Sequence, residues 1–300
     1  MHPPVRLIAI DMDGTLLPSS GAAISPRNAQ ALRAAQQAGV AVVIATGRRV
    51  AYTAPLLADL GLRADTPVIA SNGAVVKTLS GQLLDRCHME ARTAAGICAL
   101  LKSFGVMVFT FDHPGRGELV LEDLDRAQGR IALWVEANRN SIEVVKPLEL
   151  AFANGESPIQ GMIAGSILRM REAEEALKMS PWAAECESVR TEYPARDLSI
   201  LDLLPMGVSK ASALERLAGR LGIGRRETMA IGDNWNDQRI LEWAGQAVVM
   251  ANASAELRAL AKLNGWKQAP GNDDDGVAVV LERILAPTPE KRAAAASRAV

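Results

Sequence analysis

The chain has 300 residues, which suits one large domain, or a core with an insertion, better than three domains. Hydrophobic residues make up 49% of it and aromatic residues 4%, so we expect a sizeable core packed mainly by aliphatic side chains. The formal net charge is −1 with acids and bases dispersed, which argues against a nucleic-acid surface. No apolar run is long enough to span a bilayer and no secretory signal opens the chain, so we expect a cytoplasmic protein without a membrane partner. The cysteines are widely separated, which indicates neither a zinc site nor a disulfide framework.

The first expected strand ends in two acids. Residues 5–10 are almost continuously apolar and rich in branched side chains, which is typical of a buried parallel strand. Asp11 and Asp13 follow, at the end of the strand where open α/β sheets bind ligands. One interpretation is an ordinary Asp-Gly turn. A calcium loop is a second, but no glutamate closes the loop at the required spacing. The third is phosphoryl transfer, in which Asp11 attacks phosphorus and Asp13 handles the leaving-group proton.

A βα rhythm follows this acidic turn. Ser25-Pro26 looks like the cap and first residue of an Ala-rich helix that ends near Gly39. A second apolar run over residues 40–45 then ends in Thr46-Gly47-Arg48. This segment is either an ordinary strand-to-helix turn or a phosphate site, because a hydroxyl and backbone N–H groups at a helix start bind phosphate well.

A third βα unit has the same form. We expect a helix over residues 52–60 and a strand over residues 67–70, followed by the polar segment Ser71-Asn72-Gly73-Ala74. Strands that alternate with helices in this way predict an α/β fold with a parallel, doubly wound sheet.

The pattern changes between residues 85 and 193. Strand-like runs mix with helical ones there, Gly and Pro punctuate the segment, and no acidic strand end appears. The expected elements are strands over 106–111 and 159–164 and helices over 91–104 and 168–179. We therefore expect an inserted α+β domain rather than a continuation of the sheet.

The earlier rhythm returns after the insertion. Residues 197–204 are strand-like, and Lys210 opens the next helix, where the helix dipole disfavours a cation. Lys210 is either a solvated surface lysine or a functional one. Residues 228–231 form another strand, which ends in Gly232-Asp233-Asn234-Trp235-Asn236-Asp237. An ordinary turn explains a single polar segment after a strand. Several such segments occur here, and a doubly wound sheet brings the ends of its strands together, so the recurrence of these segments favours a common site.

The end of the chain completes the expected organisation. The acidic run over residues 272–275 should cap a final helix over 275–285. The predicted parts are a first core segment over 1–84, an inserted α+β cap domain over 85–193, a second core segment over 194–286 and a mobile tail over 287–300.

Together these motifs give the sequence a family resemblance. It resembles the haloacid dehalogenase superfamily, and within it the Cof-type phosphatases that carry a large α/β cap. Four segments match in order and spacing: Asp11-Met12-Asp13-Gly14-Thr15, Thr46 in Ala45-Thr46-Gly47-Arg48, Lys210 in Gly207-Val208-Ser209-Lys210, and Gly232-Asp233-Asn234-Trp235-Asn236-Asp237. Ser71-Asn72-Gly73-Ala74 and Gly276-Val277-Ala278 are similar to further Cof-type signatures. Ala211 and Gln238-Arg239-Ile240 depart from the usual pattern, but neither is at a catalytic position.

The resemblance implies a Rossmann-like core, magnesium dependence and hydrolysis of a small phosphorylated metabolite such as a sugar phosphate. It implies catalytic roles for Asp11, Asp13 and Lys210. Mg²⁺ would be held by Asp11, the backbone carbonyl of Asp13 and Asp233, since carboxylates crowded around a phosphate repel it unless a cation compensates them. The phosphate would be held by Thr46, Gly47, Asn72 and Asn236, with Asp237 in a supporting position around Lys210 or a metal-bound water.

Two alternatives stay open at this stage. A phosphomutase or phosphotransferase of the same superfamily would retain the phosphoryl group instead of releasing it. A phospho-Asp signalling domain, of a different functional class, uses a similar set of groups, although an insertion of this length does not fit it. The sequence does not name the substrate, and it leaves a monomer or a homodimer equally open.

Overall fold

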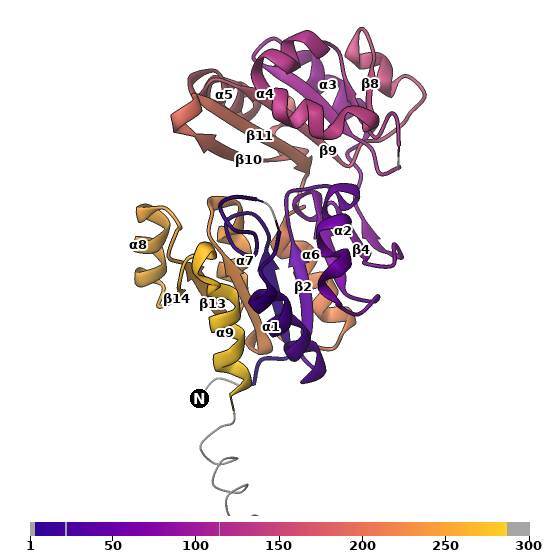
Figure 1. Ribbon diagram of the computed structural model, residues 1–300. Helices are drawn as coiled ribbons and strands as arrows, with labels where there is room; N and C mark the ends of the chain where they lie inside the picture. Colours follow the sequence, from indigo (N-terminus) through magenta and orange to yellow (C-terminus); the bar gives the residue numbers. More distant parts are fainter. Residues whose placement is uncertain (1–3, 22, 114, 287–300) are drawn as a thin grey trace, which may run out of the picture. The chain divides into compact units, whose positions relative to one another are not determined.

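The computed structural model describes residues 4–21, 23–113 and 115–286, so the tail predicted over 287–300 lies outside the described residues. The chain forms two compact units. The first contains residues up to Ala45, Ala54–Pro67 and residues from Glu215 onward, and the second contains Thr46–Thr53 and Val68–Leu214. Figure 1 labels the helices and strands.

The first unit is built on a parallel sheet with the strand order β14-β13-β12-β1-β2. Its elements are β1 (Leu7–Asp11), α1 (Pro26–Gln37), β2 (Ala41–Ala45), β12 (Thr228–Gly232), α7 (Gln238–Trp243), β13 (Gln246–Met250), α8 (Ala255–Leu263), β14 (Lys267–Ala269) and α9 (Gly276–Leu285). β1 and β12 are buried along their whole length, as expected of parallel strands covered on both faces. The predicted α/β fold is therefore confirmed.

β1 lies between strands that are distant in the sequence. It pairs with β2 on one side and with β12 on the other, so that Ile10 lies opposite Ile44 and Ile231. The strands run in the same direction, and their carboxyl ends therefore meet at one edge. This places the residues after β1 beside those after β12.

The helices α1 and α9 lie side by side although they come from opposite ends of the chain (Figure 1). Ser25 caps α1 with its hydroxyl, which accepts from the backbone N–H of Asn28 at 3.0 Å, as the sequence predicted. The acidic run precedes α9 as predicted, with Asp275 at the N-cap position, but the cap is not a side-chain hydrogen bond. Asp275 adopts a left-handed conformation and makes no side-chain cap; its carboxylate instead accepts from the Ser25 hydroxyl at 2.5 Å.

The second unit contains a hairpin and a mixed sheet. Its elements are β3 (Pro67–Ala70), β4 (Val75–Thr78), β5 (Leu83–Arg86), α3 (Ala91–Leu101), β6 (Val106–Thr110), β7 (Leu119–Leu121), α4 (Leu124–Asn138), β8 (Ile142–Val144), β9 (Gln160–Gly165), α5 (Ile167–Lys178), β10 (Cys186–Tyr193) and β11 (Leu198–Pro205). α2 (Val50–Leu57) and α6 (Lys210–Arg220) carry residues of both units. The mixed sheet has the order β10-β11-β9-β6-β7-β8, with only β7 and β8 parallel. This α+β sheet with its helices forms the predicted cap.

One strand of this sheet differs from the sequence expectation. The run over residues 197–204 was expected to open the second part of the core, but β11 pairs antiparallel with β9 and β10 of the mixed sheet. A short apolar run indicates a strand without specifying its partner, which explains the difference. The mixed sheet thus extends past residue 193, and the remaining domain boundaries stay predictions.

The two faces of the mixed sheet carry different side chains. Met107, Phe109 and Leu203 belong to an apolar cluster with α3 and α5, whereas Val106 and Val108 belong to a cluster with α4. Successive side chains on a strand point to opposite faces, so α3 and α5 cover one face and α4 covers part of the other.

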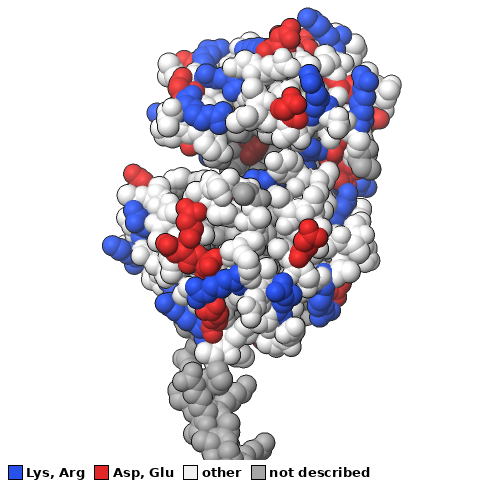
Figure 2. All heavy atoms as spheres, in the orientation of Figure 1, with Lys and Arg blue, Asp and Glu red and all other residues white. Residues whose placement is uncertain are grey.

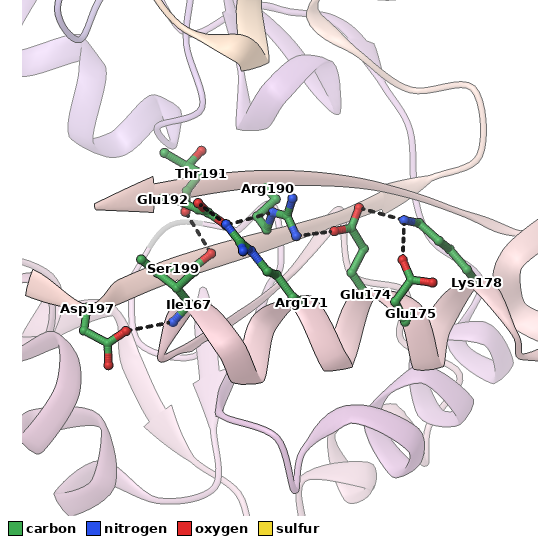
Figure 3. A network of polar contacts seen from close by, with 10 residues as sticks. All are labelled: Ile167, Arg171, Glu174, Glu175, Lys178, Arg190, Thr191, Glu192, Asp197 and Ser199. Atoms are coloured by element: carbon green, nitrogen blue, oxygen red, sulfur yellow. Dashed lines mark hydrogen bonds and ion pairs between the residues drawn. The ribbon is translucent and has the colours of Figure 1, made fainter. Parts of the chain in front are cut away.

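The outer strand β10 is bound to α5 by ion pairs at the surface, which are partly exposed to solvent (Figure 3). Arg171 donates to both carboxylate oxygens of Glu192 at 3.0 and 3.1 Å, and Arg190 lies 2.8 Å from Glu174. Surface pairs of this kind contribute little to stability, roughly 0–1 kcal/mol each. Their effect is to keep charge along an edge strand, which disfavours pairing with other chains.

The surface has no large region of one charge on the face that Figure 2 draws, where Lys and Arg alternate with Asp and Glu. This agrees with the dispersed charge in the sequence. Within the described ranges, no helix combines the length and the apolar character needed to cross a membrane.

Candidate active site

Three carboxylates meet at the carboxyl ends of β1 and β12. Asp11 is the last residue of β1, Asp233 follows β12 directly, and Asp237 lies in the short helical turn after it. One oxygen from each of them lies within 4.8 Å of the others. The parallel pairing of β1 and β12 therefore produces the acidic cluster that the sequence predicted.

Hydrogen bonds and a glycine fix the position of this cluster. Thr15 Oγ1 donates to Asp233 Oδ1 at 2.7 Å, and Asp237 Oδ2 accepts from the backbone N–H groups of Asp233 and Asn234 at 3.1 and 3.2 Å. Gly14 has a φ of +80°, and a Cβ atom there would lie 2.3 Å from Asp233 Oδ2. Both the backbone conformation and the close approach require glycine.

The donor set suits a divalent cation. Carboxylate oxygens are the ligands that Mg²⁺ and similar hard cations prefer, and a cation offsets the repulsion among three acids. Asp237, which the sequence placed in a supporting position, belongs to this group. Asp13 is not part of the group found among the described residues, and its predicted contribution is the backbone carbonyl rather than the side chain.

A second set of predicted residues meets in the second unit. The Asn72 N–H donates to the Thr46 carbonyl at 3.1 Å, and the Arg48 N–H donates to Thr46 Oγ1 at 3.1 Å. Ser71 and Asn72 both have positive φ angles, 48° and 52°, which is uncommon for residues other than glycine. Strained backbone of this kind concentrates at functional sites.

Asn72 is also held close to Lys210. Gly73 has a φ of +103°, and a Cβ atom there would lie 2.2 Å from the carbonyl oxygen of Ser209. The turn at residues 71–73 thus packs directly against the start of α6. Asn72 Oδ1 is buried and accepts no hydrogen bond within the described residues.

The structure adds Asp202, which the sequence analysis missed. Asp202 lies on β11 and accepts from Gln160 Nε2 at 2.7 Å and from Asn72 Nδ2 at 3.1 Å. Burial raises the pKa of Asp202 to about 6, against the lowering effects of these two hydrogen bonds and of the Lys210 charge. A signal was present, because a lone acid inside an apolar strand is disfavoured unless it has a role.

Asp202, Gln160 and Arg48 line a cavity of about 330 Å³, within the usual range for small-molecule sites. Its lining residues are Gly47, Arg48, Arg49, Tyr52, Val108, Thr110, Leu119, Leu133, Trp134, Ala137, Asn138, Gln160, Met162 and Asp202. Arg49 is fixed at its rim by a nearly buried ion pair with Glu118 and a hydrogen bond to Asn138 Oδ1. The cavity lies wholly within the second unit.

The predicted residues thus form two sets. The first unit contains Asp11, Asp13, Asp233, Asn236 and Asp237, and the second contains Thr46, Gly47, Asn72 and Lys210. Asn236 Oδ1 is buried without a hydrogen-bond partner among the described residues, which is consistent with a polar ligand. The cysteines form no disulfide within the described residues, and burial raises the pKa of the Cys98 and Cys186 thiols to about 12.

Comparison with known proteins identifies the family. The model of the haloacid dehalogenase-like hydrolases matches residues 8–281 of this chain. The chain belongs to this family. It is a phosphoric monoester hydrolase of the Cof type with a cap, as the sequence predicted, and it acts on small phosphorylated metabolites. The family implies a divalent metal.

Curated relatives cover almost the whole length of this phosphatase. The 5-amino-6-(5-phospho-D-ribitylamino)uracil phosphatase YwtE of Bacillus subtilis is 31% identical over 94% of this chain and 98% of its own. The phosphatase YwpJ of the same organism is 31% identical over 94% of this chain and 100% of its own. The HMP-PP phosphatase of Serratia proteamaculans is 29% identical over 85% of this chain and 87% of its own.

Solved structures share the fold. A haloacid dehalogenase-like hydrolase of Bacteroides thetaiotaomicron has a TM-score of 0.76 at 25% identity and covers 93% of this phosphatase and 99% of its own chain. A protein of Streptococcus mutans has a TM-score of 0.80 at 22% identity, over 94% of this chain and 100% of its own.

Proposed function

We propose that this phosphatase hydrolyses its ester through an aspartyl-phosphate on Asp11, with Mg²⁺ as the metal. The observation that supports the proposal is the cluster of Asp11, Asp233 and Asp237 within 4.8 Å at neighbouring strand ends. Bound there, Mg²⁺ would neutralise the acids and polarise the phosphoryl group as a Lewis acid. Asp11, Asp233 and the backbone carbonyl of Asp13 would hold it.

The chain's own residues account for both half-reactions. The carboxylate of Asp11 attacks phosphorus and the P–O bond to the leaving group breaks, while Asp13 gives that oxygen its proton. The ionised Asp13 then takes a proton from the water that attacks the aspartyl-phosphate. This second step restores Asp11 and releases inorganic phosphate.

The remaining predicted residues hold the phosphate. Lys210 offsets the negative charge of the nucleophile and the transferring group, and the Thr46 hydroxyl and Gly47 N–H donate to phosphate oxygens. Asn72 and Asn236 supply further amide donors, and Asp237 positions the groups around Asp233. Their roles follow from the family resemblance and from the close packing of Asn72 on Thr46.

The relatives do not agree on a substrate. One relative is a phosphatase of a phosphoribitylamino uracil, and others are HMP-PP phosphatases. We therefore carry over only the common class, a phosphate ester of a small metabolite, of which sugar phosphates were the sequence expectation.

The test is the Asp11→Asn variant, assayed for phosphate release with Mg²⁺ over a panel of phosphate esters. We expect activity to disappear in the variant and in wild type with excess chelator, and to persist in Asp59→Asn, which changes an exposed aspartate of the same unit. Wild-type turnover in Asp11→Asn would exclude Asp11 as the nucleophile, and full turnover with chelator would exclude the metal.

Release of phosphate and alcohol in equal amounts separates hydrolysis from a mutase, and a long-lived phosphoprotein would instead indicate a signalling domain.

A further inference from the structure

One face of the mixed sheet is left open to the cavity. The strand register places Val108 opposite Met162, Met162 opposite Asp202, and Thr110 opposite Gln160. Directly opposed residues and those two apart along a strand share a face. These five side chains therefore point the same way, and all of them line the cavity.

Most of the exposed cavity wall is apolar. Val108, Leu119, Met162 and Trp134 contribute to it from the sheet and from α4. Leu133 is 78% exposed at the same cavity, although leucine normally has a more buried position in a helix that packs on a sheet. An exposed apolar surface around a cavity indicates a ligand with an apolar face.

Several of the polar groups of the cavity are committed to one another. Arg49 is bound to Glu118 and Asn138, and the Arg48 guanidinium lies 4.8 Å from the centre of the Tyr52 ring. A leaving group with many hydroxyls would therefore place several of them against an apolar wall without partners, and each unpaired group would cost binding free energy.

Asp202, unlike these paired groups, can still accept hydrogen bonds from a ligand. Each of its carboxylate oxygens accepts one hydrogen bond, from Gln160 or from Asn72, and an ionised carboxylate oxygen can accept more than one. The group has no proton to donate when it is ionised. It selects for N–H or O–H donors on a ligand and against acceptors.

We propose that this cavity binds the leaving group of the substrate, and that Asp202 with Gln160 selects a phosphate ester whose alcohol portion carries an apolar ring with a hydrogen-bond donor. The inference rests on the proposed function. Gly47 and Arg48, in the predicted phosphate-binding segment, line the same cavity, so a group attached to a phosphate held there extends along the Val108–Asp202 face.

The experiment compares esters that differ only in the leaving group. The full-length protein with Mg²⁺ is assayed for kcat/KM on pyridoxal 5′-phosphate and uridine 5′-monophosphate, which carry a planar unsaturated ring with a hydrogen-bond donor. It is also assayed on glycerol 3-phosphate and ribose 5-phosphate, which carry hydroxyl groups but no planar unsaturated ring. Acetyl phosphate, which has neither ring nor donor, reports the basal reaction. We expect wild type to prefer the ring-bearing esters by at least about tenfold.

Two variants and their matched controls assign the preference to the cavity. Asp202→Asn should lower the ratio of ring ester to acetyl phosphate by about 10- to 100-fold, the effect of losing a hydrogen bond to a charged group. Leu133→Ala should lower it by about three- to tenfold. Asp125→Asn, an exposed acid of α4, and Leu168→Ala, an exposed leucine of α5, should leave the ratio unchanged.

The outcomes separate this inference from the proposed function. If Asp202 acts only by holding Asn72, Asp202→Asn will slow all esters alike and the ratio will stay constant, which overturns the selection. A wild type that hydrolyses acetyl phosphate with Mg²⁺ but shows no preference for ring-bearing esters also overturns it, while leaving the proposed function intact. Metal-independent hydrolysis of acetyl phosphate would instead contradict the proposed function. Circular dichroism confirms that each variant is folded.

Discussion

The parallel sheet and the mixed sheet place their polar residues differently. In the parallel sheet the acids follow the strands, as in the turns after β1 and β12, where a short sequence segment holds several of them together. In the mixed sheet Asp202 is the one acid of β11 and lies within the strand, and its partners Gln160 and Asn72 come from other elements. The residues of the proposed chemistry thus lie in local motifs, whereas the residues of the proposed selectivity are brought together only by strand pairing.

The largest effect should come from the acid after β1. Asp13→Asn should lower kcat/KM about 10²- to 10⁴-fold for glycerol 3-phosphate and for pyridoxal 5′-phosphate alike, because general acid–base assistance acts on the ester oxygen that both share. Steady-state phosphate release measures it, with Asp59→Asn as control. If Asp13→Asn changed the ester preference without lowering the rate, the proposed division of roles, with chemistry in the parallel sheet and selectivity in the mixed sheet, would be wrong.

A smaller effect should follow from crowding the acidic cluster. Gly14→Ala places a methyl group where Asp233 Oδ2 now lies, so we expect kcat/KM to fall about 10²-fold, as displacements of about 1 Å do in active sites. The Mg²⁺ concentration for half-maximal activity should rise as well. Gly39→Ala is the matched control, since Gly39 has a φ of +82° and open space around it. Equal losses in both variants would point to backbone strain rather than to displacement of Asp233.

The smallest expected effect is on stability, and it tests the role of Asp202 in the mixed sheet. The folded-state pKa of Asp202 is raised from 3.8 to about 6, so folding favours the protonated form. Its stabilising effect is complete below the unfolded pKa and is lost as the pH rises through about 6. Between pH 4 and pH 7, wild type should therefore lose roughly 2–3 kcal/mol of unfolding free energy relative to Asp202→Asn.

Urea denaturation of both proteins across this pH range measures the difference. Lys210 is a charged group that acts on Asp202, and Arg49, which is paired with Glu118, lines the same cavity. Both proteins contain these groups, so the difference between them isolates the titration of Asp202. A constant difference between pH 4 and pH 7 would show that Asp202 is ionised throughout.

Much of the fold could be predicted from short stretches of the sequence. The apolar runs that end in Asp11, Thr46 and Asp233 gave the parallel strands, because a buried parallel strand is nearly continuously apolar and its ligand groups follow it. The sheet to which residues 197–204 belong could not be predicted, since a strand in either sheet would have the same apolar character. Asp202 was missed for the same reason: its neighbours Gln160 and Asn72 become visible only with the register of β9 and β11.

Local rules also failed where a distant residue competed. Asp275 has the position and charge of a helix cap, but its side chain bonds to Ser25, at the other end of the chain. Asp237, by contrast, accepts from the backbone N–H groups of Asp233 and Asn234 within its own turn, and the same turn brings its carboxylate close to Asp11 and Asp233. Its supporting role stays a prediction.

The place of β1 between β2 and β12 has a consequence for biosynthesis. Its partner on one side emerges early, whereas residues 228–232 on the other side are translated more than two hundred residues later. At typical synthesis rates that interval is roughly 10–40 s, during which one edge of β1 lacks its strand. The acidic cluster therefore cannot form before residues 233–237 have been synthesised, and an apolar strand edge is exposed to chaperones and to other chains until β12 leaves the ribosome.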